Sequence, residues 1–176
     1  MTGRTNLSKK EAMGLARTKQ RLGEPADVHN EFCALRAQFI LKDYGYLSIR
    51  TTMRAVLVGY CRTPFHRAHR GALKDTRPED MTAAVIKSVL ERTHISGDKI
   101  EDLLLGCAYP EAEQGLNLGR ISTYLAGLPY SVPGMTTNRL CGSSMQVIHT
   151  AAGNISLGSG DAFICAGVES MSIVML

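Results

Sequence analysis

Short apolar segments alternate with longer segments of helical periodicity from residue 54 to the end of the chain. The first, at 54–60 (RAVLVGY), is apolar and β-branched and runs into Arg62, Thr63 and Pro64, as expected for a buried strand that enters a loop. Further strand-like segments lie at 100–107, 131–138 and 161–167, and helical ones at 79–93, 118–128 and 143–157. This order predicts an α/β fold with a layered βαβαβαβ arrangement, in which helices pack on the faces of a mostly parallel sheet.

The segment at 143–157 is rich in small and apolar residues, and it ends at Gly158, which is suited to a left-handed helix C-cap. Such a helix can lie deep in a core. Any part of it that the rest of the chain leaves uncovered is expected to form an exposed apolar patch.

Composition excludes several classes of protein. The chain has 176 residues, 44% hydrophobic and 20% charged, which suits one globular domain and excludes a mainly disordered, collagen-like or coiled-coil protein. It has no Trp and 6% aromatic residues, which disfavours stacking platforms for single-stranded nucleic acid. No apolar run approaches the roughly 18 to 20 residues of a membrane span, and no secretory signal is evident, so we expect a protein without a membrane span.

The net charge of +4 lies entirely before Met53. Residues 1–52 hold nine of the 20 basic residues and five of the 16 acids, so the 11 basic and 11 acidic residues that remain cancel. A neutral main segment predicts no nucleic-acid partner. We interpret 1–52 as a basic, poorly ordered leader with at most a short helix at 30–41, and 53–176 as the domain. An organelle transit peptide is the alternative for the leader.

The five cysteines are scattered, without a CxxC pair, which predicts neither a zinc ribbon nor a disulfide framework and favours a reducing compartment. They are Cys33, Cys61, Cys107, Cys141 and Cys165. Those at 61, 107 and 165 adjoin expected strands, where cysteine usually acts as a small hydrophobic residue. The histidines at 66, 69 and 94 lack paired ligand spacing, so no metal site is expected.

Cys141 differs because it lies between an extended segment and the start of a helix. Unpartnered N–H groups and the positive end of the helix dipole favour a thiolate there. Gly142 would allow a tight turn, and Ser143 or Ser144 could cap the helix. The position of Cys141 by itself does not show that it reacts, and an inert structural cysteine is the alternative. His149 follows eight residues later, roughly 12 Å along the helix and beyond hydrogen-bond reach, so we expect it to be structural or at an interface.

Blocks of residues in a fixed order identify a family resemblance. The chain closely resembles the N-terminal domain of the thiolases, and most of all the degradative 3-ketoacyl-CoA thiolases, also called acetyl-CoA acyltransferases. The resemblance covers 53–176 and nothing before Met53. It is carried by Gly158 and by the blocks at 62–65 (RTPF), 113–117 (EQGLN), 138–145 (NRLCGSSM) and 167–172 (GVESMS).

The resemblance implies that Cys141 is the catalytic nucleophile. In the family this cysteine forms an acyl thioester during thiolytic cleavage of 3-ketoacyl-CoA by CoA, which yields acetyl-CoA and a shortened acyl-CoA in fatty-acid β-oxidation. It implies CoA as cosubstrate, no resident cofactor and no metal. The family's activating histidine, second cysteine and oxyanion asparagine belong to a C-terminal half. We therefore expect the chain to be truncated, its fold incomplete and the fragment alone inactive.

The resemblance also bears on partners and location. It implies acyl-CoA and CoA as ligands, and a homodimer or homotetramer when full length, with a β-oxidation multienzyme complex as one assembly. The expected location is cytoplasmic, or mitochondrial or peroxisomal in a eukaryote. Three alternatives stay open: a noncatalytic dimerisation or binding module derived from a thiolase, a biosynthetic acetoacetyl-CoA thiolase, and a condensing enzyme of fatty-acid synthesis. Acyl chain length and the residues that bind CoA are not predicted.

Overall fold

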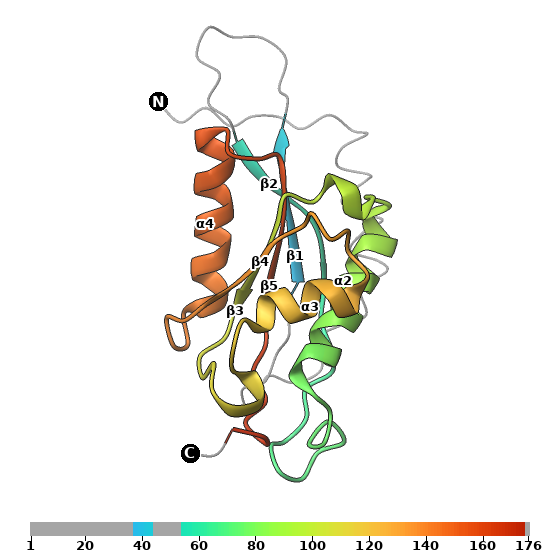
Figure 1. Ribbon diagram of the computed structural model, residues 1–176, viewed down its shortest axis with the longest axis vertical. Coiled ribbons are helices and arrows are strands. Elements are labelled where there is room, and N and C mark those ends of the chain that lie inside the picture. Colours follow the sequence, from blue (N-terminus) through green and yellow to red (C-terminus); the bar gives the residue numbers. More distant parts are fainter. Residues whose placement is uncertain (1–36, 44–53, 175–176) are drawn as a thin grey trace, which may run out of the picture. The chain divides into compact units, whose positions relative to one another are not determined.

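A five-stranded sheet organises the part of the chain that the structure describes. In this computed structural model the described residues are 37–43 and 54–174, all within one compact unit, Glu31–Leu176. The sheet has the strand order β2-β1-β5-β3-β4 (Figure 1). The strands are β1 (Ala37–Asp43), β2 (Arg54–Cys61), β3 (Asp102–Gly106), β4 (Gly134–Thr137) and β5 (Ala162–Gly167).

Four of the five strands run in the same direction. Strand β3 pairs in parallel with both β4 and β5, and β1 pairs antiparallel with both β5 and β2. The α/β class and the mostly parallel sheet are thus confirmed, and β1 makes the sheet mixed.

Strand β1 corrects the prediction for the leader. A helix at 30–41 is wrong for residues 37–41, since residues 37–43 form an inner strand with a neighbour on each side. Ile40 pairs with Leu57 of β2 and with Phe163 of β5. Pairing of the backbone along both edges is a long-range interaction that outweighs a weak local helical pattern. The rest of the expected leader, with Cys33, lies outside the described residues.

The helices begin and end close to where the periodicity predicts. They are α2 (Pro78–Thr93), α3 (Leu118–Ala126) and α4 (Ser143–Leu157). Gly127 and Gly158 follow α3 and α4 with φ of 76° and 73°, so both helices end in a left-handed cap that suits glycine. Short 3-10 turns lie at Gly97–Lys99 and Ala112–Gln114. No helix among the described residues is both long and apolar enough to span a membrane.

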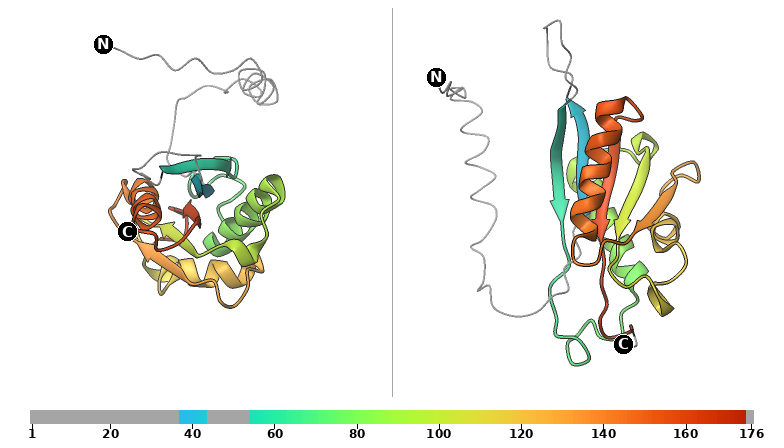
Figure 2. Two further views of the ribbon diagram at one scale, coloured as in Figure 1. Left: turned by 90° about the horizontal axis from the view of Figure 1, so that it is seen from above. Right: turned by 90° about the vertical axis from the view of Figure 1, so that its left-hand side faces the viewer.

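The sheet separates two layers of helices, with α2 and α3 on one face and α4 on the other (Figure 2). Leu103 and Leu105 of β3 join the core under α2 and α3, whereas Leu104 joins the core under α4. All three leucines have 0% exposure. Alternate residues of a strand point to opposite faces, so a continuous apolar run fits a strand that is covered on both sides.

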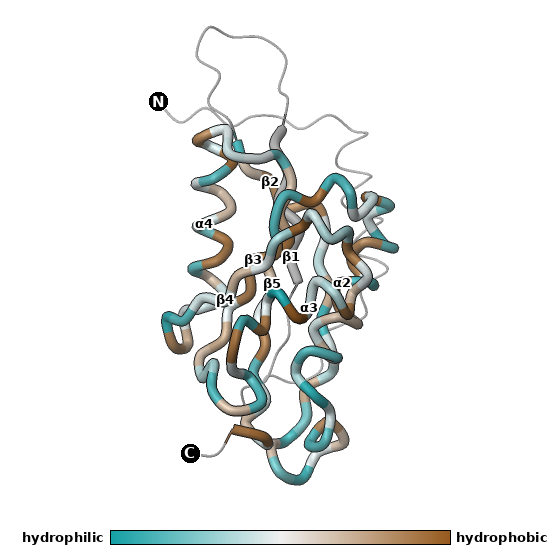
Figure 3. The backbone as a smooth tube through the Cα atoms, viewed as in Figure 1, coloured by the Kyte–Doolittle hydropathy of each residue, from teal (hydrophilic) through white to brown (hydrophobic). Residues whose placement is uncertain are grey.

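Helix α4 is covered on one side only within the described part of the chain. Val147, Ala151 and Ile155 are fully buried against the sheet, whereas Met145 and Leu157 are 57% and 82% exposed. Apolar positions therefore continue along the helix beyond its buried stripe (Figure 3). These two residues lie at opposite ends of α4, so they do not by themselves form the expected apolar patch.

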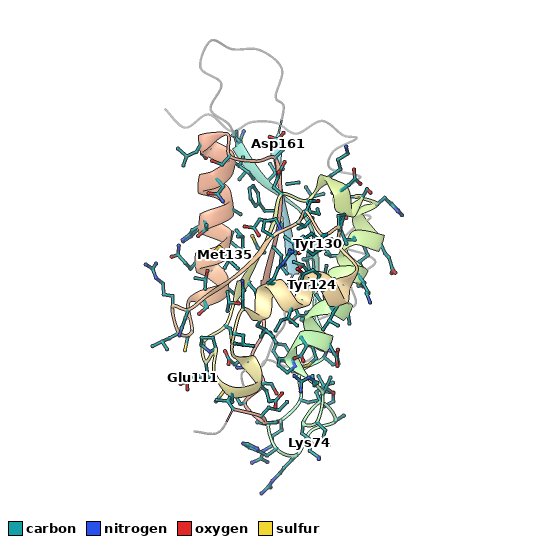
Figure 4. All side chains as sticks on the ribbon, in the orientation of Figure 1. Lys74, Glu111, Tyr124, Tyr130, Met135 and Asp161 are labelled. Carbon is teal, nitrogen blue, oxygen red and sulfur yellow. The ribbon has the colours of Figure 1, made fainter. Side chains whose placement is uncertain are left out.

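An arginine fastens α3 to the loop before β4. The guanidinium of Arg120 lies 4.3 Å and 5.3 Å from the ring centroids of Tyr124 and Tyr130, and these two labelled rings lie beside each other (Figure 4). Arg120 also donates hydrogen bonds to the carbonyl oxygens of Tyr130, at 3.1 Å, and Val132. These contacts fix the start of β4, which leads to the turn containing Cys141.

Candidate active site

Cys141 lies in the turn between β4 and α4, where α4 approaches the ends of two parallel strands. Gly106 is the last residue of β3, and a Cβ built on it would come within 2.6 Å of the backbone carbon of Ser143 and the nitrogen of Ser144. Gly167, at the end of β5, is equally crowded by the Ser144 side chain. The two glycines let the N-terminus of α4 lie directly against the carboxyl ends of β3 and β5.

The unusual backbone conformation of the turn belongs to Leu140. Its φ is 46°, in the left-handed region that a non-glycine residue rarely adopts, whereas Gly142 has φ of −91°. Gly142 does not need the left-handed region, but a Cβ on it would lie 3.3 Å from the Arg139 carbonyl oxygen, so its missing side chain still suits the tight turn. The N–H of Leu140 donates to Asn138 Oδ1 at 2.8 Å, and the N–H of Gly142 donates to the Arg139 carbonyl at 3.0 Å. These bonds hold Leu140 in a conformation that costs on the order of 1–3 kcal/mol.

Ser143 closes the turn and does not cap the helix. No side chain caps α4, so the prediction that Ser143 or Ser144 would do so is wrong. The hydroxyl of Ser143 accepts the N–H of Arg139 at 2.9 Å, and it lies 2.6 Å from the Leu140 carbonyl oxygen. Because this side chain is directed back into the turn and is 3% exposed, it is not available to the amides of the first helical turn.

Among the cysteines of the described residues, Cys141 alone is exposed. Burial, followed by the nearby Glu169 carboxylate, raises the pKa of Cys107 to about 12. Burial and Asp102 raise the pKa of Cys165 to about 12 as well. Cys61 is 8% exposed and donates to Ser88 Oγ at 3.3 Å. The thiols at 61, 107 and 165 therefore belong to the core, as expected, and Cys141 is the accessible thiol of this region.

No histidine of the described region is hydrogen-bonded to Cys141. His149 is exposed on α4, and the other three histidines of the described region, at 66, 69 and 94, are exposed too. Within that region no hydrogen bond involves the Cys141 thiol, and no cluster of three or more His, Cys, Asp or Glu residues could hold a metal. A base for this thiol is thus not provided by the residues that the structure describes.

Two features of the site had no signal in the sequence. The left-handed Leu140 is a residue type that disfavours that conformation, and the contact between Ser143 and the turn depends on how α4 meets the sheet. Only the position of Cys141 just before a helix could be read from the residues themselves.

Comparison with known proteins identifies the family. The family described as Thiolase, N-terminal domain matches residues 55–175, so the chain belongs to the thiolase family. The 3-ketoacyl-CoA thiolase of Bacillus subtilis is 49% identical over 120 residues, which cover 68% of this chain and 31% of that protein. That of Idiomarina loihiensis is 45% identical with the same coverage. The chain therefore spans about a third of the length of these relatives.

A solved structure supports the fold. The crystal structure of the Bacillus anthracis acetyl-CoA acetyltransferase matches with a TM-score of 0.56 and 31% identity, over 60% of this chain and 26% of that one. The thiolase-like fold is thus confirmed. Strand β1 precedes the residues that the family match covers.

We expect iodoacetamide to alkylate Cys141 well before Cys61, Cys107 and Cys165 in the folded chain near neutral pH. Only an accessible thiolate reacts, and the other three thiols are buried. Peptide mapping by mass spectrometry at successive times gives the four rates, and the same measurement in concentrated urea provides the control in which all four thiols react alike. Equal rates in the folded chain would contradict a preformed nucleophile.

Proposed function

We propose that this chain is the nucleophile-bearing part of a 3-ketoacyl-CoA thiolase. The thiolate of Cys141 attacks the 3-keto carbon of the substrate, and the bond between carbons 2 and 3 breaks. The electron pair of that bond takes up a proton at carbon 2, which releases acetyl-CoA and leaves the shortened acyl group as a thioester on Cys141. The thiol of a second CoA then attacks this thioester, so that a shortened acyl-CoA leaves and the free cysteine returns.

The observation that carries this proposal is the exposed thiol immediately before α4 in a chain of the thiolase family. The N–H of Ser143 already donates to the Leu140 carbonyl, but no side chain caps α4, and a helix N-terminus favours negative charge. The names of the relatives, 3-ketoacyl-CoA thiolase, favour this substrate class. In this proposal CoA is a cosubstrate, and no metal or resident cofactor takes part.

Residues 1–176 alone are not expected to complete turnover. Both half-reactions move a proton, and within the described residues the Cys141 thiol has no hydrogen-bonding partner that could accept one. We propose that further parts of the full-length protein supply this group. We also propose that the full-length protein is a homodimer or homotetramer that acts in the cytoplasm, in fatty-acid β-oxidation or in a multienzyme complex for it.

The acetyl-CoA acetyltransferase reaction is the second candidate. The structural neighbour from Bacillus anthracis bears that name. The role of Cys141 would be unchanged, and the acyl group on it would be acetyl.

We expect acetyl-CoA to transfer its acetyl group to Cys141 of the 176-residue chain by thiol–thioester exchange, and we expect no catalytic thiolysis of acetoacetyl-CoA. Intact mass and peptide mapping detect the acetyl group, and absorbance of the 3-ketoacyl thioester follows thiolysis. The variant Cys141→Ser should lose the acetylation, whereas Cys61→Ser, which changes a buried thiol, should keep it. Acetylation spread equally over several cysteines, or absent from Cys141, would rule out the proposed nucleophile.

A further inference from the structure

Two sequence blocks that the proposed chemistry leaves without a role meet in space. Gln114 lies in the block at 113–117, and Glu169 lies in the block at 167–172. The side-chain nitrogen of Gln114 donates to Glu169 Oε1 at 2.6 Å and to the Tyr109 carbonyl at 2.8 Å, and its oxygen accepts the N–H of Ser170 at 2.5 Å. Gln114 has 0% exposure, so a fully buried amide has partners for both of its ends.

Glu169 in turn holds the end of β3. Its Oε2 accepts the N–H of Ala108 at 2.7 Å, and the thiol of Cys107 donates to Oε1 at 3.9 Å. Cys107 remains a protonated donor because its pKa is raised to about 12. A carboxylate that accepts both a backbone N–H and a buried amide makes strong, charge-assisted hydrogen bonds, so residues 107 and 108 are held firmly.

The same two residues support the turn that contains Cys141. The N–H of Cys107 donates to the carbonyl of Thr137 at 3.0 Å, just before the turn. The carbonyl oxygen of Cys107 lies 3.4 Å from the hydroxyl of Ser143, which holds Arg139 and Leu140. A continuous set of hydrogen bonds therefore connects Gln114 and Glu169 with both ends of the turn.

We propose that Gln114 and Glu169 are positioning residues that set the orientation of Cys141 through the Cys107–Ser143 contact. They do not touch the substrate. Their function is to hold the end of β3 as a rigid support, so that the turn keeps the exposed thiol at the start of α4. This inference deepens the proposed function, because it assigns a supporting structure to the same nucleophile.

The test compares Glu169→Gln with Glu111→Gln in the full chain. Each variant loses one negative charge: Glu169 bonds the residues that follow β3, and Glu111 lies a few residues further along the same segment. Glu111 differs in being exposed, and its labelled side chain lies at the periphery (Figure 4). In Glu169→Gln an amide NH₂ replaces one of the two carboxylate oxygens. Both oxygens accept hydrogen bonds, from Ala108 N and Gln114 Nε2, and an NH₂ group cannot accept one, so one of these two bonds is lost. We expect the alkylation rate of Cys141 near neutral pH to fall by about two- to fivefold, the range by which a helix N-terminus stabilises an exposed anion. The pH profile of the rate should shift upward.

Labelling of Cys165 in the same samples reports whether the variant is folded, since that thiol is buried and Glu169 is not among the groups that shift its pKa. A folded Glu169→Gln variant whose Cys141 rate and pH profile equal those of Glu111→Gln would overturn the proposal, even if its thermal midpoint were lower. Should Glu169→Gln fail to fold, Glu169→Asp, which keeps the charge but shortens the side chain, decides the matter by the same readout. Because alkylation needs no acyl donor, a failure of the acetylation test leaves this comparison intact.

Discussion

Replacing Ile40 by proline is expected to destabilise the fold by about 3 kcal/mol or more, a large part of the roughly 5–15 kcal/mol that keeps a domain folded. Ile40 lies in β1, between Leu57 of β2 and Phe163 of β5. Proline has no backbone N–H and is disfavoured in an inner strand; the register of β1 and β2 shifts between Phe39 and Ile40, but Ile40 itself is paired with a residue of each neighbouring strand. Since β2 has β1 as its only strand neighbour in the described sheet, loss of β1 would also detach β2.

The urea midpoint of unfolding, followed by circular dichroism, measures this effect. Ile40→Val is the matched control, because it keeps the backbone N–H and a β-branched side chain. Hydrogen exchange should show loss of amide protection in β2 and β5 of the proline variant. Coincident midpoints for the two variants would mean that β1 adds nothing to the stability of the domain, and the segment before the family match would then be dispensable.

Gly106→Ala should lower the stability by about 1–3 kcal/mol through overpacking. The added Cβ would come within 2.6 Å of the backbone of Ser143 and Ser144, which cannot rotate away as a flexible side chain can. The N-terminus of α4 would have to move off the sheet, and Cys141 would move with it. We therefore expect a lower urea midpoint together with a changed alkylation rate at Cys141.

Gly153→Ala makes the same substitution on the solvent side of α4 and is expected to have the opposite effect. A Cβ at Gly153 would meet nothing within 4 Å, and alanine in a helix interior is more stable than glycine by about 0.5–1 kcal/mol. Its urea midpoint should rise and the Cys141 rate should stay unchanged. If Gly106→Ala kept or raised the midpoint, as Gly153→Ala should, the close contact between α4 and the end of β3 would be refuted.

The sequence by itself determined the elements that depend on local patterns. Periodicity and the following glycine placed α4 at 143–157, the bounds that the structure shows, and four apolar segments became β2, β3, β4 and β5. The position of Cys141 before a helix followed from the same patterns. Hydrophobic period and helix caps act over a few residues, so they can be recognised without knowledge of the fold.

The tertiary structure alone decided the features that depend on distant partners. Residues 37–41 are a strand because β2 and β5 lie on either side of them, and the turn that contains Cys141 meets the end of β3 through the contact between Ser143 and Cys107. Gln114 meets Glu169 across 55 residues of chain. Each of these outcomes depends on a hydrogen bond or a close contact that exists only after the sheet has formed, and no local pattern encodes its partner.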